Sequence, residues 1–169
     1  MKTLLLPAIG TLVIALFVGQ YVMASDTGTV SATVTVQNIS VSVTDGSVAY
    51  LTIAAGGTQD TTTAGVNDSQ TATNDGNITE KFNIKGANTT GCVWTLYATQ
   101  DANKYFHKFC TTTCDTSPSW TALTTDYQTL AASIAKDGTQ VFDLQIGVPT
   151  SSSCYTEATA NVTVQAALP

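Results

Sequence analysis

The sequence is poor in charged residues. They occupy 11% of its 169 positions, with 6 basic and 12 acidic side chains, against about 25% in an average soluble domain. Nucleic-acid affinity depends on cationic side chains that release counterions from phosphates. A net charge of -6 would instead repel a phosphate backbone, so nucleic acid is not expected as a partner.

The sequence also lacks the groups of residues that catalysis requires. A hydrolytic triad needs a histidine beside a nucleophile and a carboxylate, but His107, the single histidine, lies in an aromatic run where a packed ring is expected. The carboxylates are scattered through turns and are not paired as glycosidases require. No glycine-rich phosphate loop occurs, and a calcium site at the Asn67-Asp68 and Asn74-Asp75 turns is the weaker alternative to plain turn formation. We predict a protein that is not an enzyme and has no cofactor.

Small hydroxyl residues are abundant, with 32 threonines and 12 serines. This composition is typical of an extracellular β-protein. The hydrophobic share of 43% excludes intrinsic disorder, because a core of this size offsets the chain entropy lost on folding. A length of 169 residues predicts one compact domain, since domains average roughly 150 residues.

The N-terminus has the layout of a secretory signal peptide. One lysine precedes an apolar stretch, Leu4–Gly19, and a short polar segment ends at Ala24. Compact residues at positions 22 and 24 fit a signal peptidase, so the mature chain is predicted to begin at Ser25. The apolar stretch is shorter than the roughly 20 residues that a transmembrane helix needs.

Two alternatives use residues 1–24 as an apolar N-terminal helix. One is an uncleaved anchor, in which residues 4–19 would contact a membrane. The other is a type IV pilin-like tail cleaved after Gly10, although the basic residue before that glycine and the acidic residue after it are both missing.

Four cysteines indicate an oxidising destination, extracellular or at the cell surface, because an even count in an exported chain is usually a disulfide set. They allow three pairings. Cys110 and Cys114 bracket three threonines in a turn and can meet across it, which leaves Cys92 with Cys154. The alternative is a zinc site from His107, Cys110, Cys114 and one more cysteine, but its H-x2-C-x3-C spacing matches no common zinc module.

Period-two alternation of polar and apolar residues dominates the mature chain, which indicates half-buried strands. In residues 29–36 the even positions are apolar, and the phase reverses after Asn38, so a bend is expected there. Asp45-Gly46 is typical of a hairpin turn. Further strands are predicted at residues 39–43, 48–53, 78–85, 92–98, 142–148 and 158–166, with 127–134 as a strand or a helix and one short strand among the turns of 55–77.

Eight or nine short strands at intervals near ten residues predict an all-β fold, an antiparallel two-sheet sandwich of immunoglobulin-like type over residues 25–169. Five of the eight asparagines lie in N-x-S/T sequons, where about two are expected by chance from the acceptor rule. Two explanations stay open: N-glycosylation, or chance in a threonine-rich chain. The five are Asn38, Asn67, Asn77, Asn88 and Asn161.

The segment Ser31–Asn88 carries Ser40-Val41-Ser42-Val43, then Ala54-Ala55-Gly56-Gly57-Thr58, then the corner Asn74-Asp75-Gly76-Asn77 that leads into the next predicted strand. In this layout the chain resembles small immunoglobulin-like exported surface proteins, similar to the camelysin-type filament proteins of biofilm matrices and to archaeal bundling pilins. The loop Cys110–Cys114 is not part of that layout.

The resemblance implies assembly by donor-strand exchange, in which each subunit lends its N-terminal strand to the sheet of a neighbour. Such a strand must be amphipathic and free at one end, and residues 26–36 meet this requirement. A head-to-tail contact of this kind does not close, so it propagates as a fibre. The expected function is a structural subunit of an extracellular filament with itself as partner, and the alternative is a first strand that pairs within its own sandwich.

A second hypothesis is a secreted monomeric adhesin or carbohydrate-binding module, with glycans or other surface proteins as partners. Residues 103–120 concentrate aromatic side chains around the Cys110–Cys114 pair, and aromatics on a stiff loop can stack on sugar rings. The candidate ligand residues are Tyr105, Phe106 and Trp120.

Overall fold

The computed structural model of the protein describes residues 27–62 and 66–169. Over this range the protein is all-β and contains no helix, and therefore none that could cross a membrane. The predicted signal segment, residues 1–24, lies outside the described residues, as does its interpretation as an apolar helix. The strands are β1 (Val41–Thr44), β2 (Thr58–Asp60), β3 (Gln70–Asn74), β4 (Glu80–Gly86), β5 (Thr90–Gly91), β6 (Thr95–Leu96), β7 (Lys104–Cys110), β8 (Thr121–Ala122), β9 (Gln128–Ile134), β10 (Thr139–Gly147), β11 (Ala158–Thr159) and β12 (Val162–Ala167).

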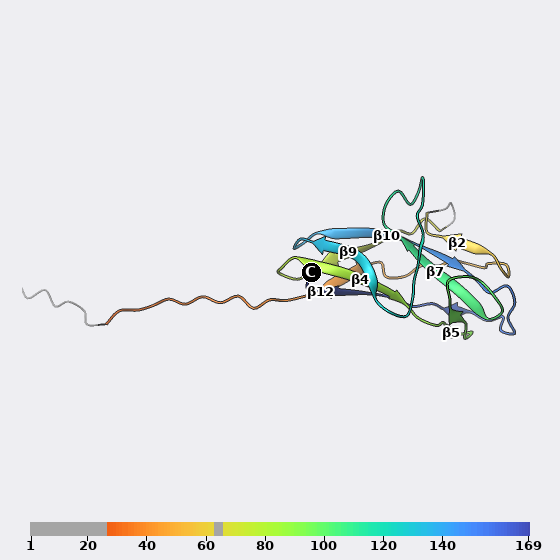
Figure 1. Cartoon of the computed structure of the whole chain (residues 1–169), viewed down its shortest axis with the longest axis horizontal. Helices are drawn as coiled ribbons and strands as arrows, with labels where there is room; N and C mark the ends of the chain where they lie inside the picture. The colour runs from red at the N-terminus through yellow and green to blue at the C-terminus, as the bar shows by residue number, and fades with distance from the viewer. Residues whose placement is uncertain (1–26, 63–65) are drawn as a thin grey trace, which may run out of the picture. The chain divides into compact units, whose positions relative to one another are not determined.

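Strand β10 is the centre of the largest sheet, which has the order β1-β3-β10-β7-β6, with β2 also beside β10 and β8 beside β7. A second sheet has the order β12-β4-β9, and β11 pairs with β5 in a short two-stranded ladder. Figure 1 shows β7 beside β10, and β4, β9 and β12 together. The strand pairs are antiparallel except for β6 and β7, which run parallel.

The core lies where the predicted alternation puts it on β4 and β10. Phe82 and Ile84 of β4 are fully buried, and the residues that alternate with them, Lys81, Asn83 and Lys85, are half-buried. Phe142, Leu144 and Ile146 of β10 are buried in the same core cluster. The amphipathic pattern of these two strands was therefore sufficient to predict both their structure and their buried face.

The prediction of an aromatic loop at residues 103–120 is wrong for residues 104–110, because Lys104–Cys110 forms strand β7 within the main sheet. Both faces of this strand are buried, so its sequence does not alternate between polar and apolar residues. Tyr105 faces the core with no exposed surface. Phe106, which is also buried, lies against Gly147 of β10, where a Cβ atom would come within 2.3 Å of the phenyl ring.

Two predicted strands are not formed. Residues 29–36 and 48–53 have no strand structure, and the second half of the predicted hairpin after Asp45-Gly46 is therefore missing. The turn itself is present, with φ of 70° and 67° at these two residues. Elsewhere residues 127–134 resolve to strand β9, the predicted strand at 92–98 shrinks to β6, and the turn-rich segment 55–77 holds two strands, β2 and β3.

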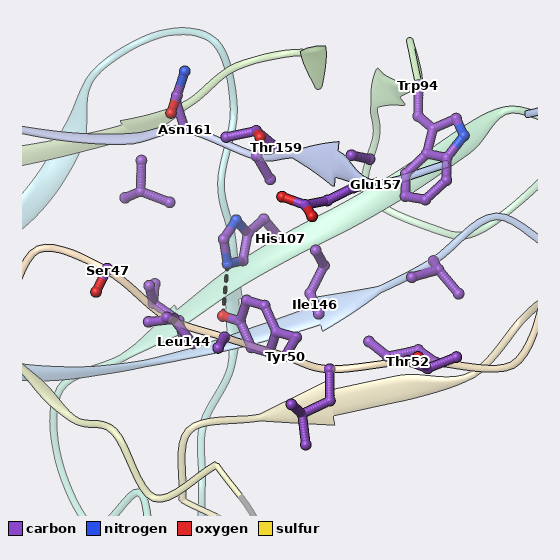
Figure 2. A pocket seen from close by; sticks show the side chains of 18 of the residues that line it. Ser47, Tyr50, Thr52, Trp94, His107, Leu144, Ile146, Glu157, Thr159 and Asn161 are labelled. Carbon is purple, nitrogen blue, oxygen red and sulfur yellow. Dashed lines mark hydrogen bonds between the residues drawn. The ribbon is translucent and has the colours of Figure 1, made fainter. Parts of the chain in front are cut away.

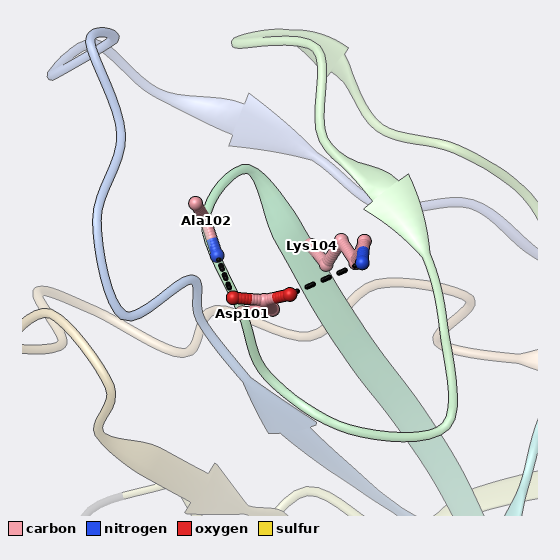
Figure 3. A network of polar contacts seen from close by, with 3 residues as sticks. All are labelled: Asp101, Ala102 and Lys104. Atoms are coloured by element: carbon pink, nitrogen blue, oxygen red, sulfur yellow. Dashed lines mark hydrogen bonds and ion pairs between the residues drawn. The ribbon is translucent and has the colours of Figure 1, made fainter.

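The connection from β6 to β7 is fixed by a small polar network (Figure 3). The Asp101 carboxylate accepts hydrogen bonds from the backbone N–H of Ala102 at 2.8 Å and from Lys104 Nζ at 3.1 Å. The Ala102 N–H and then the Lys104 ammonium hold the pKa of Asp101 below its ordinary value. These contacts hold the turn that leads into β7.

Both cysteine pairs are bonded as predicted. Cys92 is joined to Cys154 across a sequence separation of 62, and Cys110 to Cys114 across a separation of 4. The zinc alternative at His107, Cys110 and Cys114 is therefore wrong, because both sulfur ligands are oxidised. Two disulfides are consistent with an oxidising environment.

Removing the long disulfide should destabilise the protein more than removing the short one. By chain entropy, a loop of 62 residues contributes about 4 kcal/mol and the Cys110–Cys114 loop about 2 kcal/mol. Each kcal/mol shifts the melting midpoint of a domain this size by about 2–4 °C. We expect the Cys92→Ser/Cys154→Ser variant to melt about 10 °C below the parent, and Cys110→Ser/Cys114→Ser to melt about 5 °C below it, by scanning calorimetry. Equal losses in the two variants would contradict this account.

Candidate functional site

A long groove opens between two parts of the chain that are distant in sequence. One wall is formed by residues 47–53, here called the strap, and the other by residues 154–162 together with Val164. The groove has a volume of about 1030 Å³. Pockets for small molecules have volumes of about 300–1,000 Å³ and enclose most of their ligand, so this long open groove suits an extended segment of chain better.

The floor of the groove belongs to the core of the main sheet. Leu144 and Ile146 of β10 and His107 of β7 form it, and Trp94 lies at one end (Figure 2). These floor side chains are buried apart from Trp94. The apolar wall residues are only partly buried, and they are Val48, Tyr50 and Ile53 of the strap with Ala160, Val162 and Val164 opposite. The apolar surface that is still accessible in the groove therefore belongs to the two walls, on the sides that face each other.

One wall carries an unpaired strand edge. Among the described residues β12 pairs only with β4, and β11 only with β5. The other edge of both strands is left without a backbone partner. An open edge of this kind is a ready template for another strand.

His107 is buried in the floor of the groove. It is 2% exposed, and its Nε2 lies 2.9 Å from the Tyr50 hydroxyl of the strap, the two rings meeting edge to face. Its Nδ1 is also buried and has no hydrogen-bond partner among the described residues. In Figure 2 this second nitrogen points away from Tyr50, toward the wall that carries Thr159.

Burial sets the protonation state of this pair. Burial lowers the pKa of His107 to about 4, so the ring is neutral at neutral pH. Burial also raises the pKa of Tyr50 well above its ordinary value, helped by the negative charges of Asp60, Asp68 and Asp143. The contact between strap and floor is therefore a hydrogen bond between two neutral groups.

The segment that precedes the first strand exposes its apolar side chains. Val30, Val34 and Val36 are 94%, 91% and 79% exposed. They occupy alternate positions together with Ala32, and residues 28–36 include no charged residue. Singly exposed valines are ordinary on a protein surface, whereas these three form one exposed apolar stripe, and contiguous exposed apolar surface is typical of interaction sites.

Residues 36–40 are held by the corner before β4. Asn77 Nδ2 donates to the Val36 carbonyl at 2.8 Å, while Asn77 Oδ1 accepts from the Asn38 N–H at 2.8 Å. The Asn77 N–H donates in turn to the Asn38 carbonyl, and Glu80 Oε1 accepts from the Ser40 N–H at 2.9 Å. This clasp fixes the point where the N-terminal segment joins β1.

The aromatic residues predicted to bind sugars do not form a common surface. Tyr105 and Phe106 are buried on opposite faces of β7, and Tyr105 donates its hydroxyl hydrogen to the Ala87 carbonyl. Only Trp120 is partly exposed. The predicted ligand site at these three residues is therefore not formed, because a loop was expected where the chain forms a strand.

The five sequon asparagines all lie on the surface of the protein, and they are Asn38, Asn67, Asn77, Asn88 and Asn161. Two of them have structural roles through their side chains: Asn77 in the clasp and Asn88, whose Oδ1 accepts from the Leu96 N–H. Asn161 lies at the rim of the groove (Figure 2). Glycosylation at these positions stays a prediction.

The turns considered for calcium are built from internal hydrogen bonds. Asn74 is buried and donates to the carbonyls of Ile78 and Ile134, and Asp68 accepts from Gln70. Within residues 27–62 and 66–169 no group of three or more histidine, cysteine, aspartate or glutamate residues is arranged to hold a metal ion.

Comparisons with models of known protein families, with curated proteins and with solved structures find no match to this chain. The resemblance to camelysin-type filament proteins and archaeal bundling pilins therefore stays a prediction. The groove was not predicted from the sequence. Its walls were both predicted as strands, at 48–53 and 158–166, but nothing in either pattern says that they face each other.

The neutral, buried His107 should make folding stability depend on pH. An unfolded histidine has a pKa of about 6.5, and burial lowers the pKa of His107 to about 4. Between these values the unfolded chain binds a proton that the folded chain does not. The contribution to stability is therefore complete above pH 6.5 and is lost as the pH falls toward 4, at about 1.4 kcal/mol per pH unit.

Urea denaturation at steps from pH 7 to pH 4 measures this slope. The matched variant His107→Gln keeps a polar group beside Tyr50 but cannot titrate. We expect its free energy of unfolding to fall less steeply than that of the parent over the same range. Parallel curves for the two proteins would show that His107 does not take up a proton on unfolding.

Proposed function

We propose that this protein is a non-enzymatic structural subunit of an extracellular filament, in which residues 28–36 of one copy fill the groove of the next. The groove, bounded on one side by an unpaired strand edge, is the observation that carries the proposal. In this view the fold is an immunoglobulin-like sandwich that lacks one strand. The signal-like N-terminus and the two disulfides support secretion to the cell surface.

The donor segment and the groove match in length and in pattern. Residues 28–36 and 156–164 both contain nine residues, which as a strand extend about 30 Å. The alternate residues Val30, Ala32, Val34 and Val36 supply the apolar face that the partly exposed walls lack. The intervening threonines and serine would face solvent, and no charge would enter the groove.

Burial of the valines supplies a favourable free energy. Each fully buried valine contributes about 1.5 kcal/mol relative to an exposed one, and two of them, Val30 and Val34, are almost fully exposed in the free segment. Pairing with the open edge of β11 and β12 adds backbone hydrogen bonds. Since the donor lies at one end of the chain and the acceptor groove is formed by the body of the next copy, the contact is head-to-tail and continues without closing.

A charge in the donor segment should prevent assembly when it lies on the inward face. We expect wild-type protein to form filaments in negative-stain microscopy, and Val34→Asp to raise the concentration needed for assembly more than 100-fold, because a valine burial is lost and a carboxylate is desolvated. Thr33→Asp is the matched control, since it adds the same charge one position away on the outward face, and it should assemble nearly as well as the parent.

Analytical ultracentrifugation over a wide concentration range separates the outcomes. Monomers at every concentration, with slow amide exchange at residues 28–36, would mean that the segment fills the groove of its own subunit. That result would overturn the proposal. Equal loss of assembly in the Val34→Asp and Thr33→Asp variants would also count against it, because a seated strand must distinguish its two faces.

A further inference from the structure

The strap has the sequence of a strand without its structure. Residues 48–53 read Val-Ala-Tyr-Leu-Thr-Ile, a run enriched in the β-branched and aromatic residues that favour strands. In the subunit they form none, and Leu51 has a φ of +61°. This left-handed conformation is unfavourable for a residue with a Cβ atom. Leu51 is also 78% exposed, so no packing of its side chain accounts for the conformation.

The backbone of the strap is unpaired beyond Ser47, whose carbonyl accepts a hydrogen bond from Gln70 Nε2. None of the N–H or C=O groups of residues 48–53 makes a hydrogen bond to another described residue. The strap is attached instead by side-chain contacts, namely the Tyr50 hydroxyl at His107 and Gln70 Nε2 at the Ser47 carbonyl. Backbone groups that are buried in folded proteins almost always have a hydrogen-bond partner. The unpaired N–H and C=O groups of this segment are therefore available to water or to a neighbouring strand.

Two unpaired edges thus face each other across one floor. The strap lines one side of the groove, and β11 with β12 line the other. Figure 2 shows Ser47, Tyr50 and Thr52 on one side and Glu157, Thr159 and Asn161 on the opposite side, with His107, Leu144 and Ile146 between them. A strand seated over this floor would have an unpaired backbone on each side of it.

We propose that the strap becomes a β-strand when the groove is filled, so that the incoming strand is hydrogen-bonded on both edges. This inference rests on the proposed function, since the incoming strand is residues 28–36 of a second copy. Leu51 leaves its left-handed conformation in the process, and Tyr50 keeps the strap beside the floor. The donor then becomes an internal strand of the second sheet, and the strap becomes the new edge.

Hydrogen exchange tests the ordering of the strap. The full chain carrying Val30→Asp and Val34→Asp presents an intact groove with an inactive donor, and a synthetic peptide of residues 27–36 serves as the probe. We expect bound peptide to slow amide exchange at least 100-fold both in residues 158–164 and in residues 48–53. Protection of 158–164 alone would overturn the strap inference and leave the proposed function standing. A peptide that does not bind at all would overturn both.

Substitution of Leu51 provides a second test with a matched pair of variants. Glycine accepts a φ of +61° and disfavours a strand, whereas valine disfavours the left-handed conformation and favours a strand. Because the side chain is exposed, both variants should fold. We expect the peptide to bind the Leu51→Val protein about tenfold more tightly than the Leu51→Gly protein, by isothermal titration calorimetry in the same inactive-donor background. Equal dissociation constants would show that the strap does not change conformation on binding.

Discussion

Each strand of a sheet has two hydrogen-bonding edges, and much of this structure follows from which edges are filled. Strand β10 is paired on both, with β2 and β3 along one edge and β7 along the other. Its side chains therefore hold a fixed floor on which the second sheet can pack. Within the described part of the chain, strand β12 is paired on one edge only. The groove exists because the second sheet ends there while the floor continues beneath it.

The same constraint explains why a buried polar pair lies in an apolar groove. Tyr50 has no strand to fix it, and its hydroxyl hydrogen bond to His107 replaces the backbone ladder that would otherwise hold the strap to the body. Because His107 is buried, breaking this hydrogen bond would leave its ring nitrogen without a partner, at a cost of about 1–3 kcal/mol. The bond therefore keeps the strap beside the floor.

The sequence was informative wherever a strand has one buried and one exposed face. Strand β4 lies within two residues of its predicted bounds, and the predicted strand 158–166 is formed as two strands, β11 and β12. Strand β7 could not be recognised in this way, because Phe106 and Cys110 are buried on the face opposite to Tyr105. A strand that is buried on both faces does not alternate between polar and apolar residues, so in the sequence it could not be distinguished from a cluster of aromatic residues.

Of the candidate site, the N-terminal segment could be predicted from the sequence and the groove could not, for a different reason. The proposed donor segment is a local pattern, and its alternation is visible in residues 29–36 alone. The groove is formed by segments that are more than 100 residues apart in the sequence, residues 47–53 and 154–164, and a single sequence does not show which segments meet. Residues 48–53 have the composition that favours a strand, but they do not form one. A strand needs a neighbouring strand to pair with, and no described strand lies hydrogen-bonded beside these residues.

The Cys92–Cys154 bond also determines how the protein would respond to a pulling force. A chain pulled at its two ends can lengthen only through residues outside a closed covalent loop. The loop of 62 residues withholds roughly 200 Å of extended chain, at about 3.4 Å for each residue. It encloses β7, β9 and β10, so the central strands of the main sheet cannot be drawn out to full length while the sulfur–sulfur bond is intact. Tension along the backbone would bypass this segment through the disulfide, so the chain could lengthen only through the residues before Cys92 and after Cys154.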